Sequence, residues 1–287
     1  MMLVRELKSV CVINIKKWFT NPRIYILGLI MGLVLICYSY DYYKVSSEIG
    51  YGVNILGLFV SVYGGAPGFT RIMTLFGSVL LFCDAPFMDE NQQFVYLRLG
   101  RKRWVAGTII YVFVASFIYT LYLILALALG VLPNIGISAE WGELFEVTSI
   151  NSGIIKAGIT QKVLMDYSVL TSFLYMFDAV FLSCVIIGLV MYIVALFAKK
   201  GECILVGCGI IIIEGVGLYF TENISNILFH VSPLSLMQIW CLDDGSGNSY
   251  YPDMNFGIVF YVGLTIVLLL IGMTVSKFAN FEIGTEK

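Results

Sequence analysis

The sequence predicts an all-α, polytopic membrane protein with six transmembrane helices and both termini in the cytoplasm, and three observations lead to that prediction. Hydrophobic residues make up 59% and charged residues 13% of the 287 residues, against about 45–50% and about 25% in soluble domains. The mean hydropathy is +0.91, which is more apolar surface than a soluble core of this size can bury. The apolar residues form long runs and not the short alternating segments of outer-membrane barrels. This composition excludes a soluble enzyme, a disordered chain and a collagen-like chain.

A transmembrane helix needs about 20 apolar residues, and five runs of the sequence come close to that length or exceed it. A sixth, weaker span is expected between Tyr51 and Pro86, where the glycines around Pro67 would bend or start the helix. Two spans would not fit in that stretch, because each needs about 30 Å of helix. The six spans are predicted near residues 24–40, 66–86, 104–132, 167–198, 203–220 and 256–276.

The distribution of charge predicts which side of the membrane the termini occupy. With six spans both termini share one side, and most of the 17 Lys and Arg residues fall in the termini and connections of that side. Lys44, Arg71, Lys156 and Lys162 fall toward the other side. Because cytoplasmic loops carry the excess of Lys and Arg, the termini are predicted to be cytoplasmic. The outer connections are acidic and hold Glu140, Glu143, Glu146, Asp166, Glu222, Asp243, Asp244 and Asp253.

Residues 3–19 precede the first span and are predicted to form an amphipathic helix, because their apolar side chains gather in one arc of about 140°. A helix with basic residues opposite such an arc lies along the inner membrane surface. Asn21 and Pro22 would end it. The helix is either a functional element or an ordinary juxtamembrane anchor. A cleaved signal peptide is not expected, because the first apolar run begins only at Ile24 and no small-residue cleavage site follows it.

The second cytoplasmic connection, residues 87–101, is predicted to contain a short helix with its own caps. Asp89 suits the N-cap with Gln92 three residues later, and Gly100 suits the stop. So short a helix is marginal in water, and its apolar residues therefore predict a docking partner. Alternatively, the basic residues that follow anchor the loop to anionic lipid. The candidate docking residues are Asp89, Glu90, Phe94, Tyr96, Leu97, Arg98 and Arg101.

Ionisable residues within a span are costly and are candidates for function. Arg71 and Glu214 are predicted at similar depth, about 20 Å and about 18 Å above the cytoplasmic ends of their spans. We therefore expect an Arg71–Glu214 ion pair or a shared polar cavity, which would serve either as a brace between helices or as a polar substrate or gating contact. Asp178 is expected near the outer surface.

These features together resemble the permease subunit of an ABC-2-type ATP-binding-cassette exporter. The resemblance covers nearly the whole chain: the interfacial helix, the six spans and the capped loop helix between spans two and three. The segments that resemble the family are Phe82-Cys83-Asp84-Ala85-Pro86-Phe87, Arg98-Leu99-Gly100-Arg101-Lys102-Arg103-Trp104 with Gly107, and Phe229-His230-Val231-Ser232-Pro233-Leu234-Ser235-Leu236.

The resemblance implies a function for each of these segments. The short helix in residues 87–101 would be the coupling helix that docks in a groove of an ATPase subunit. The Ser-Pro-Leu turn would belong to a re-entrant hairpin within the outer loop, residues 221–254. The chain has no G-x-x-x-x-G-K-[ST] phosphate loop, so ATP and Mg²⁺ would bind the partner ATPase and this chain would bind no cofactor. The other partners would be membrane lipid and a second copy of the chain or a similar permease, and not nucleic acid.

The family resemblance also implies that spans one and five of two copies meet. Gly28 and Gly32 have the G-x-x-x-G spacing in span one, and Gly207 and Gly215 lie in span five. Small residues allow close helix approach. This spacing does not tell which helix they meet, so packing within one chain is the alternative to a dimer.

Other functions remain open at this stage. An ion-coupled secondary transporter or channel would use Glu214 and Asp178, but the sequence shows no internal repeat or paired broken helices. An intramembrane enzyme is disfavoured because His230 is the only histidine and no G-x-S-x-G is present. The seven cysteines lack metal-site spacing and are expected to be buried hydrophobes.

The substrate is only weakly indicated. Acidic outer loops and an apolar pathway suit an amphipathic, cationic peptide, with a lipid or a drug as alternatives. The expected location is the cell membrane, as a multi-pass protein of a bacterial plasma membrane.

Overall fold

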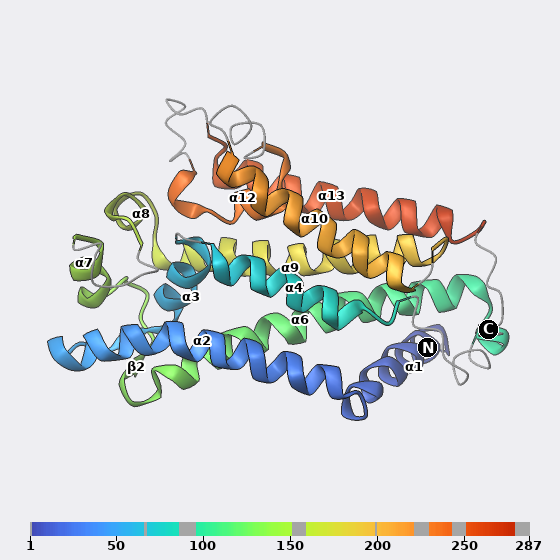
Figure 1. Cartoon of the computed structure of the whole chain (residues 1–287), viewed down its shortest axis with the longest axis horizontal. Coiled ribbons are helices and arrows are strands. Elements are labelled where there is room, and N and C mark those ends of the chain that lie inside the picture. The colour runs from blue at the N-terminus through green and yellow to red at the C-terminus, as the bar shows by residue number, and fades with distance from the viewer. Residues whose placement is uncertain are drawn as a thin grey trace.

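The computed structural model describes residues 2–65, 68–85, 96–150, 159–198, 200–220, 230–242 and 251–278. Long helices lie side by side along the long axis of the molecule (Figure 1). Four of the described helices are long and apolar enough to cross a membrane: α2 (Pro22–Ile49), α6 (Arg101–Gly130), α9 (Val169–Ala195) and α13 (Met254–Val275). The helix α10 (Lys200–Phe220) runs beside α9 and α4. The chain is therefore a helical membrane protein, whereas the number of six spans stays a prediction.

The helix α9 lies at the centre and contacts α3, α4, α6, α10 and α13. Ser168 caps its start by accepting a hydrogen bond from the Thr171 backbone N–H. Its inner residues, such as Met176 and Cys184, have no exposed surface. A Cβ on Gly188 would lie 2.7 Å from Val112 and 2.8 Å from Phe82, so only glycine allows α6 and α4 to approach this closely. All seven cysteines are free thiols, and five of them are buried.

The predicted second span is divided in two. The helices α3 (Ile55–Gly64) and α4 (Phe69–Phe82) meet at an angle of 88°. Gly68 has φ +77°, the left-handed conformation that glycine adopts without strain, and it precedes the first turn of α4. The expected bend or helix start at the glycines around Pro67 is therefore confirmed. The span itself is shorter than the predicted 66–86, because α4 has only 14 residues and the separate buried helix α3 precedes it.

The first helix, α1 (Met2–Lys16), continues in a short 3-10 turn, η1 (Lys17–Phe19), and together they occupy the predicted range 3–19. The helix packs on α6, where a Cβ on Gly107 would lie 2.8 Å from Val10. Asn21 then caps α2, its side chain accepting from the Arg23 backbone N–H, with Pro22 at the first helical position. The predicted break at Asn21 and Pro22 is thus confirmed, while the location of α1 at a membrane surface stays a prediction.

The opposite end of the molecule carries a layer that the sequence did not predict. The strand β1 (Val53–Asn54) pairs in parallel with β2 (Ile135–Gly136). The Asn54 side chain donates to the carbonyls of Glu140 at 2.7 Å and Ser138 at 3.0 Å. The remaining elements of this end are η2 (Leu132–Asn134), α7 (Glu143–Ile150) and α8 (Gln161–Asp166).

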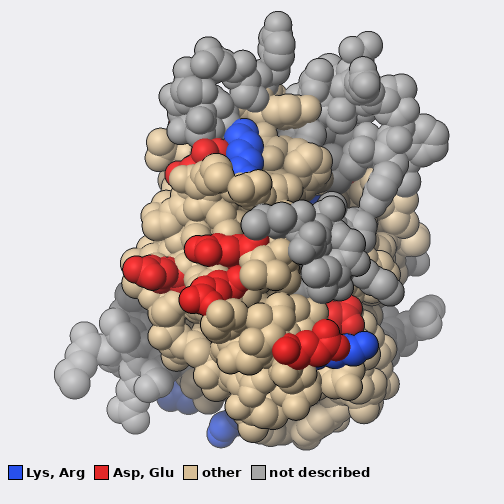
Figure 2. Space-filling view, turned by 90° about the vertical axis from the view of Figure 1, so that its left-hand side faces the viewer, with Lys and Arg blue, Asp and Glu red and all other residues tan. Residues whose placement is uncertain are grey.

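The two ends, here called the α1 end and the α7 end, differ in charge. Figure 2 shows that Asp and Glu predominate over Lys and Arg on the described surface of the α7 end. Its exposed acidic residues are Glu48, Glu140, Glu143, Glu146 and Asp166, and its exposed basic residues are Lys44 and Lys162. At the α1 end the exposed basic residues are Lys16, Arg23, Arg98, Lys102, Arg103 and Lys277. The C-terminal end of α13 also lies at the α1 end (Figure 1), where Arg101 Nη1 donates to the Lys277 carbonyl at 2.9 Å.

Candidate functional site

The two described ends of the predicted coupling loop, here called its roots, lie at the α1 end, and Asp84 anchors the first of them. The Asp84 carboxylate accepts one hydrogen bond from Asn21 Nδ2 and pairs with Arg23 Nη1, each at 3.0 Å. Both partners lie at the start of α2. The chain segment that follows α4 is thereby tied to the joint between η1 and α2.

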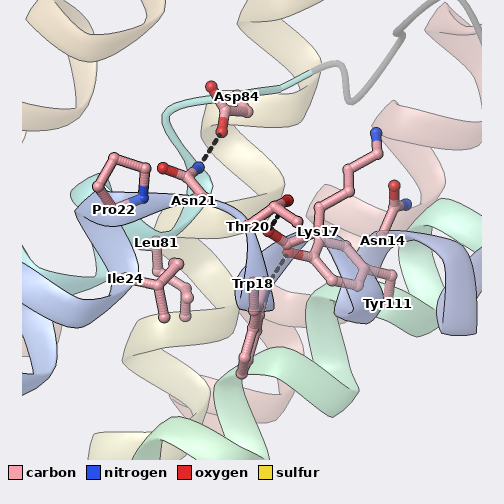
Figure 3. Close-up of a pocket in the computed structure, with 10 residues that line it drawn as sticks. All are labelled: Asn14, Lys17, Trp18, Thr20, Asn21, Pro22, Ile24, Leu81, Asp84 and Tyr111. Carbon is pink, nitrogen blue, oxygen red and sulfur yellow. Dashed lines mark hydrogen bonds between the residues drawn. The ribbon is translucent and has the colours of Figure 1, made fainter.

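A polar pocket of about 340 Å³ lies at this joint. Figure 3 shows its lining residues, which come from α1, η1, the start of α2, the end of α4 and α6. Trp18 Nε1 donates to Tyr111 Oη at 2.9 Å across it, and their rings meet edge to face at 6.5 Å. Asn14, 2% exposed, also lines the pocket. The pocket thus joins four helices next to the loop.

The second root of the loop packs on the protein itself. Residues 96–99 are helical, and Gly100, with φ +76°, donates its N–H to the Tyr96 carbonyl at 2.9 Å. The Tyr96 ring meets Trp104 edge to face at 5.8 Å. Tyr96 and Leu99 pack on a small buried cluster that contains Val10, Trp104, Val105, Tyr192 and Leu196. Gly100 therefore stops a helix, as predicted.

The candidate docking residues separate into three groups. Leu97 is 68% exposed and Arg98 is exposed, so both are available to a partner. Tyr96 and Arg101 instead contact the protein itself. Asp89, Glu90 and Phe94 lie outside the described residues.

A second polar site surrounds the predicted Ser-Pro-Leu turn and is here called the turn lock. The turn forms α12 (Pro233–Leu236), followed by η3 (Ile239–Cys241). Three helices hold its backbone: Tyr175 of α9 donates to the Leu236 carbonyl at 2.7 Å, Tyr261 of α13 donates to the Pro233 carbonyl, and Glu214 of α10 accepts from the Leu234 N–H at 3.3 Å. The residues from 232 to 239 are all buried. The buried turn agrees with part of a re-entrant segment; the rest of the predicted outer loop lies largely outside the described residues.

Arg71 is 4% exposed and turns back to its own broken span. Its Nη1 donates to the Tyr63 and Gly65 carbonyls, each at 3.0 Å, at the C-terminal end of α3. Among the described residues the expected Arg71–Glu214 ion pair is therefore wrong: Glu214 binds the turn and Arg71 binds the end of α3. The alternative, a shared polar cavity, stays a prediction.

Asp178 does not belong to the turn lock. It lies in the third turn of α9 with an exposed side chain, beside Leu174, which is 54% exposed. Among the described residues, no three His, Cys, Asp or Glu side chains lie close enough together to hold a metal ion.

The glycines expected at a dimer interface face helices of the same chain. A Cβ on Gly32 would lie 2.7 Å from Tyr122 Oη, and one on Gly28 3.8 Å from the same atom. A Cβ on Gly207 would lie 3.1 Å from Val79 and one on Gly215 3.4 Å from Ile72. The intramolecular alternative therefore explains all four glycines, and a dimer has to be argued from other residues.

Sequence reasoning missed the tyrosines that hold the turn lock. Tyr175 and Tyr261 lie within apolar runs, where they resemble ordinary core residues. The available signal was chemical: a tyrosine hydroxyl buried in a span needs an acceptor. The Ser-Pro-Leu turn supplies free carbonyls because α12 has only four residues, and the last four carbonyls of a helix have no partner within it.

We expect Asp84→Asn to change stability by less than about 1 kcal/mol, because the Arg23 and Asp84 side chains are 49% and 38% exposed and exposed ion pairs contribute about 0–1 kcal/mol. The apparent melting temperature of the purified protein measures this. A loss of several kcal/mol would show that the pair supports the whole fold and not only the root of the loop.

Comparison of the sequence with known family models found no match, and comparison with curated proteins found none. The fold itself defines the class: a helical membrane protein with several helices of membrane-spanning length and composition.

Proposed function

We propose that this chain is the membrane-spanning subunit of an ATP-binding-cassette exporter and that residues 87–101 couple it to a separate ATPase subunit. One observation carries the proposal: the loop is tied to the protein at both described ends, and Leu97, which directly follows the second tie at Tyr96, is 68% exposed. Asp84 ties the first root to α2, and Tyr96 ties the second to the cluster formed by α1, α6 and α9.

A loop held in this way transmits a displacement to the helices. Rigid helices that move as units carry domain motions in many proteins. A push on Leu97 would reach α6 and α9 through Trp104 and Tyr192 of the buried cluster. A push on the start of the loop would reach α2 through Asp84. ATP-driven closure of two ATPase subunits would supply that push, while this chain forms the translocation pathway in the cell membrane of a bacterium.

The charge of the α7 end supports an amphipathic, cationic peptide as the substrate. Exposed acidic residues predominate there (Figure 2), and an acidic surface at the end of the translocation pathway would attract cations. Export would then release the peptide on that side. A lipid or a drug would use the same pathway without this attraction.

An ion-coupled transporter is the second candidate, and the break between α3 and α4 favours it. Transporters of that kind bind ions at broken helices, and here α3 ends in carbonyls that Arg71 occupies. The arginine places a fixed positive charge where a cation would bind, which is why we prefer the exporter.

The test is purification of the tagged chain from the membranes of its own host. We expect an ATPase subunit to co-elute, with ATP hydrolysis in the eluate. Leu97→Asp should weaken the affinity for the ATPase about 30-fold, the effect of losing one interface hot spot, and thereby lower the amount that co-elutes. The matched control is Ile137→Asp, the same change at an 81% exposed site of the α7 end, which should bind ATPase like the wild type. Equal ATPase recovery with all three proteins, or none with the wild type, would refute the proposal.

A further inference from the structure

A second pocket at the α1 end lies between the start of α6 and the end of α13, outside both polar sites described above. Its volume is about 380 Å³. The lining has two chemical parts. The basic part consists of Arg101, Lys102 and Lys277, and the apolar part of Val105, Ala106, Leu270 and Met273; Thr274 and Ser276 complete the lining.

The cations and the apolar residues of the pocket are arranged like the headgroup and the acyl chains of a phospholipid in a membrane. Lys102 precedes the apolar residues of α6, and Lys277 follows those of α13, so the cations lie at the end of the helices and the apolar walls lie toward their middle. Leu270 and Met273 are 59% and 52% exposed, and they continue along α13 into the exposed Val267. A phosphate at the cations would thus have its acyl chain directed along apolar helix surface.

The charge of the pocket selects an anionic occupant. None of the described residues that line it is Asp or Glu, and Lys102 and Lys277 are exposed, so an anionic headgroup would be attracted more strongly than a neutral or cationic one. Basic pockets between transmembrane helices on the cytoplasmic side bind anionic headgroups. A free phosphate would satisfy the cations but would leave the apolar walls in contact with water or with unrelated lipid.

We propose that this pocket binds one anionic phospholipid of the inner leaflet, with its phosphate between Lys102 and Lys277 and an acyl chain against Leu270 and Met273. The lipid bridges the second root of the loop to α13, beside the hydrogen bond from Arg101 to the Lys277 carbonyl. This site goes beyond the proposed transport function and does not depend on it.

The test is native mass spectrometry of the purified full chain titrated with phosphatidylglycerol. Phosphatidylcholine with the same acyl chains tests the headgroup, and inorganic phosphate tests the free anion as the alternative source. We expect one saturable phosphatidylglycerol per chain, at least tenfold weaker binding of phosphatidylcholine, and no displacement of lipid by millimolar phosphate. Displacement by phosphate, or equal binding of both lipids, would overturn the proposal.

Variants distinguish lipid binding in this pocket from a general attraction of anionic lipid to the basic surface of the α1 end. Lys102→Gln with Lys277→Gln should weaken phosphatidylglycerol binding about 25-fold, because each basic residue near an anionic lipid contributes about fivefold. Ala106→Leu, which fills the apolar part without changing charge, should weaken it at least fivefold. The matched control is Lys16→Gln, an exposed cation of the same end outside the pocket, which should bind lipid like the wild type. The proposed site would be refuted if both pocket variants bound phosphatidylglycerol as tightly as the wild type. It would also be refuted if Lys16→Gln lost as much affinity for this lipid as the pocket variants do.

Discussion

Arg71→Leu is expected to destabilise the protein by about 2–6 kcal/mol, since each of two buried carbonyls left without a donor costs about 1–3 kcal/mol. The arginine is 4% exposed and supplies both the Tyr63 and the Gly65 carbonyls at 3.0 Å. Leucine fills similar space but donates nothing. The Tyr63 and Gly65 carbonyls would then be buried without this donor, and the 88° junction with α4 would keep the hydrogen bond from Thr70 to the Val62 carbonyl but lose the two from Arg71.

The measurement is the apparent melting temperature of the purified protein in detergent, with Arg103→Leu as the matched control, because the Arg103 side chain is exposed. We expect the Arg71 variant to melt well below the wild type or to aggregate, and the Arg103 variant to melt within a few degrees of the wild type. Equal melting of both variants would show that Arg71 does not hold the broken span together.

The second large effect is expected where α2 meets α6. A Cβ on Gly32 would lie 2.7 Å from Tyr122 Oη, and this hydroxyl donates to the Gly28 carbonyl. Gly32→Ala should therefore cost about 1–3 kcal/mol, the usual cost of overpacking. Tyr122→Phe removes the atom that the new methyl group meets, so the double variant should recover part of this loss.

A double-mutant cycle on melting measures the coupling between the two changes, which residues in contact show at about 0.5–3 kcal/mol. Gly209→Ala is the matched control, because nothing lies within 4 Å of its Cβ position and alanine has the higher helix propensity. Additive effects of Gly32→Ala and Tyr122→Phe, or an unchanged stability with a lost dimer, would place Gly32 between two chains instead.

Local chemistry made some features predictable from the sequence. Asn21 before Pro22 predicts a capped helix start, and Gly100 predicts a helix stop, because each rests on the backbone preference of one or two residues. The apolar runs predict the long helices for a similar reason, since burial in lipid requires a minimum length. All of these hold in the structure.

Other features depend on the direction in which a side chain points around its helix axis. Counting residues from the end of a span gives the depth of a side chain but not this direction. Arg71 and Glu214 were placed at similar depth, yet one turns to the end of α3 and the other to the turn at Leu234. Likewise, the spacing of Gly28 and Gly32 predicts a helix face without side chains, but it does not predict which residue packs on that face. In the structure this residue is Tyr122. Tertiary contacts decide both, and a single sequence does not contain them in readable form.

The function itself remains a proposal, because the sequence matches no family model and no curated protein. The resemblance to exporter permeases rests on segments around Asp84, Gly100 and Pro233. In the structure, two of these segments form the roots of the loop, and the third is held by Tyr175, Tyr261 and Glu214. Coupling to an ATPase stays a proposal, and the partner has to be found by experiment.

Site-specific photo-crosslinking at position 97 in native membranes tests the central claim most directly. A photoreactive amino acid replaces Leu97 at the α1 end, and a second variant carries it in place of Met165, which is 73% exposed at the α7 end. We predict that position 97 crosslinks to a nucleotide-binding ATPase on the cytoplasmic side, with a yield that changes when ATP is added, and that position 165 does not. Crosslinks from position 97 only to lipid or to a protein on the outer side would contradict the account.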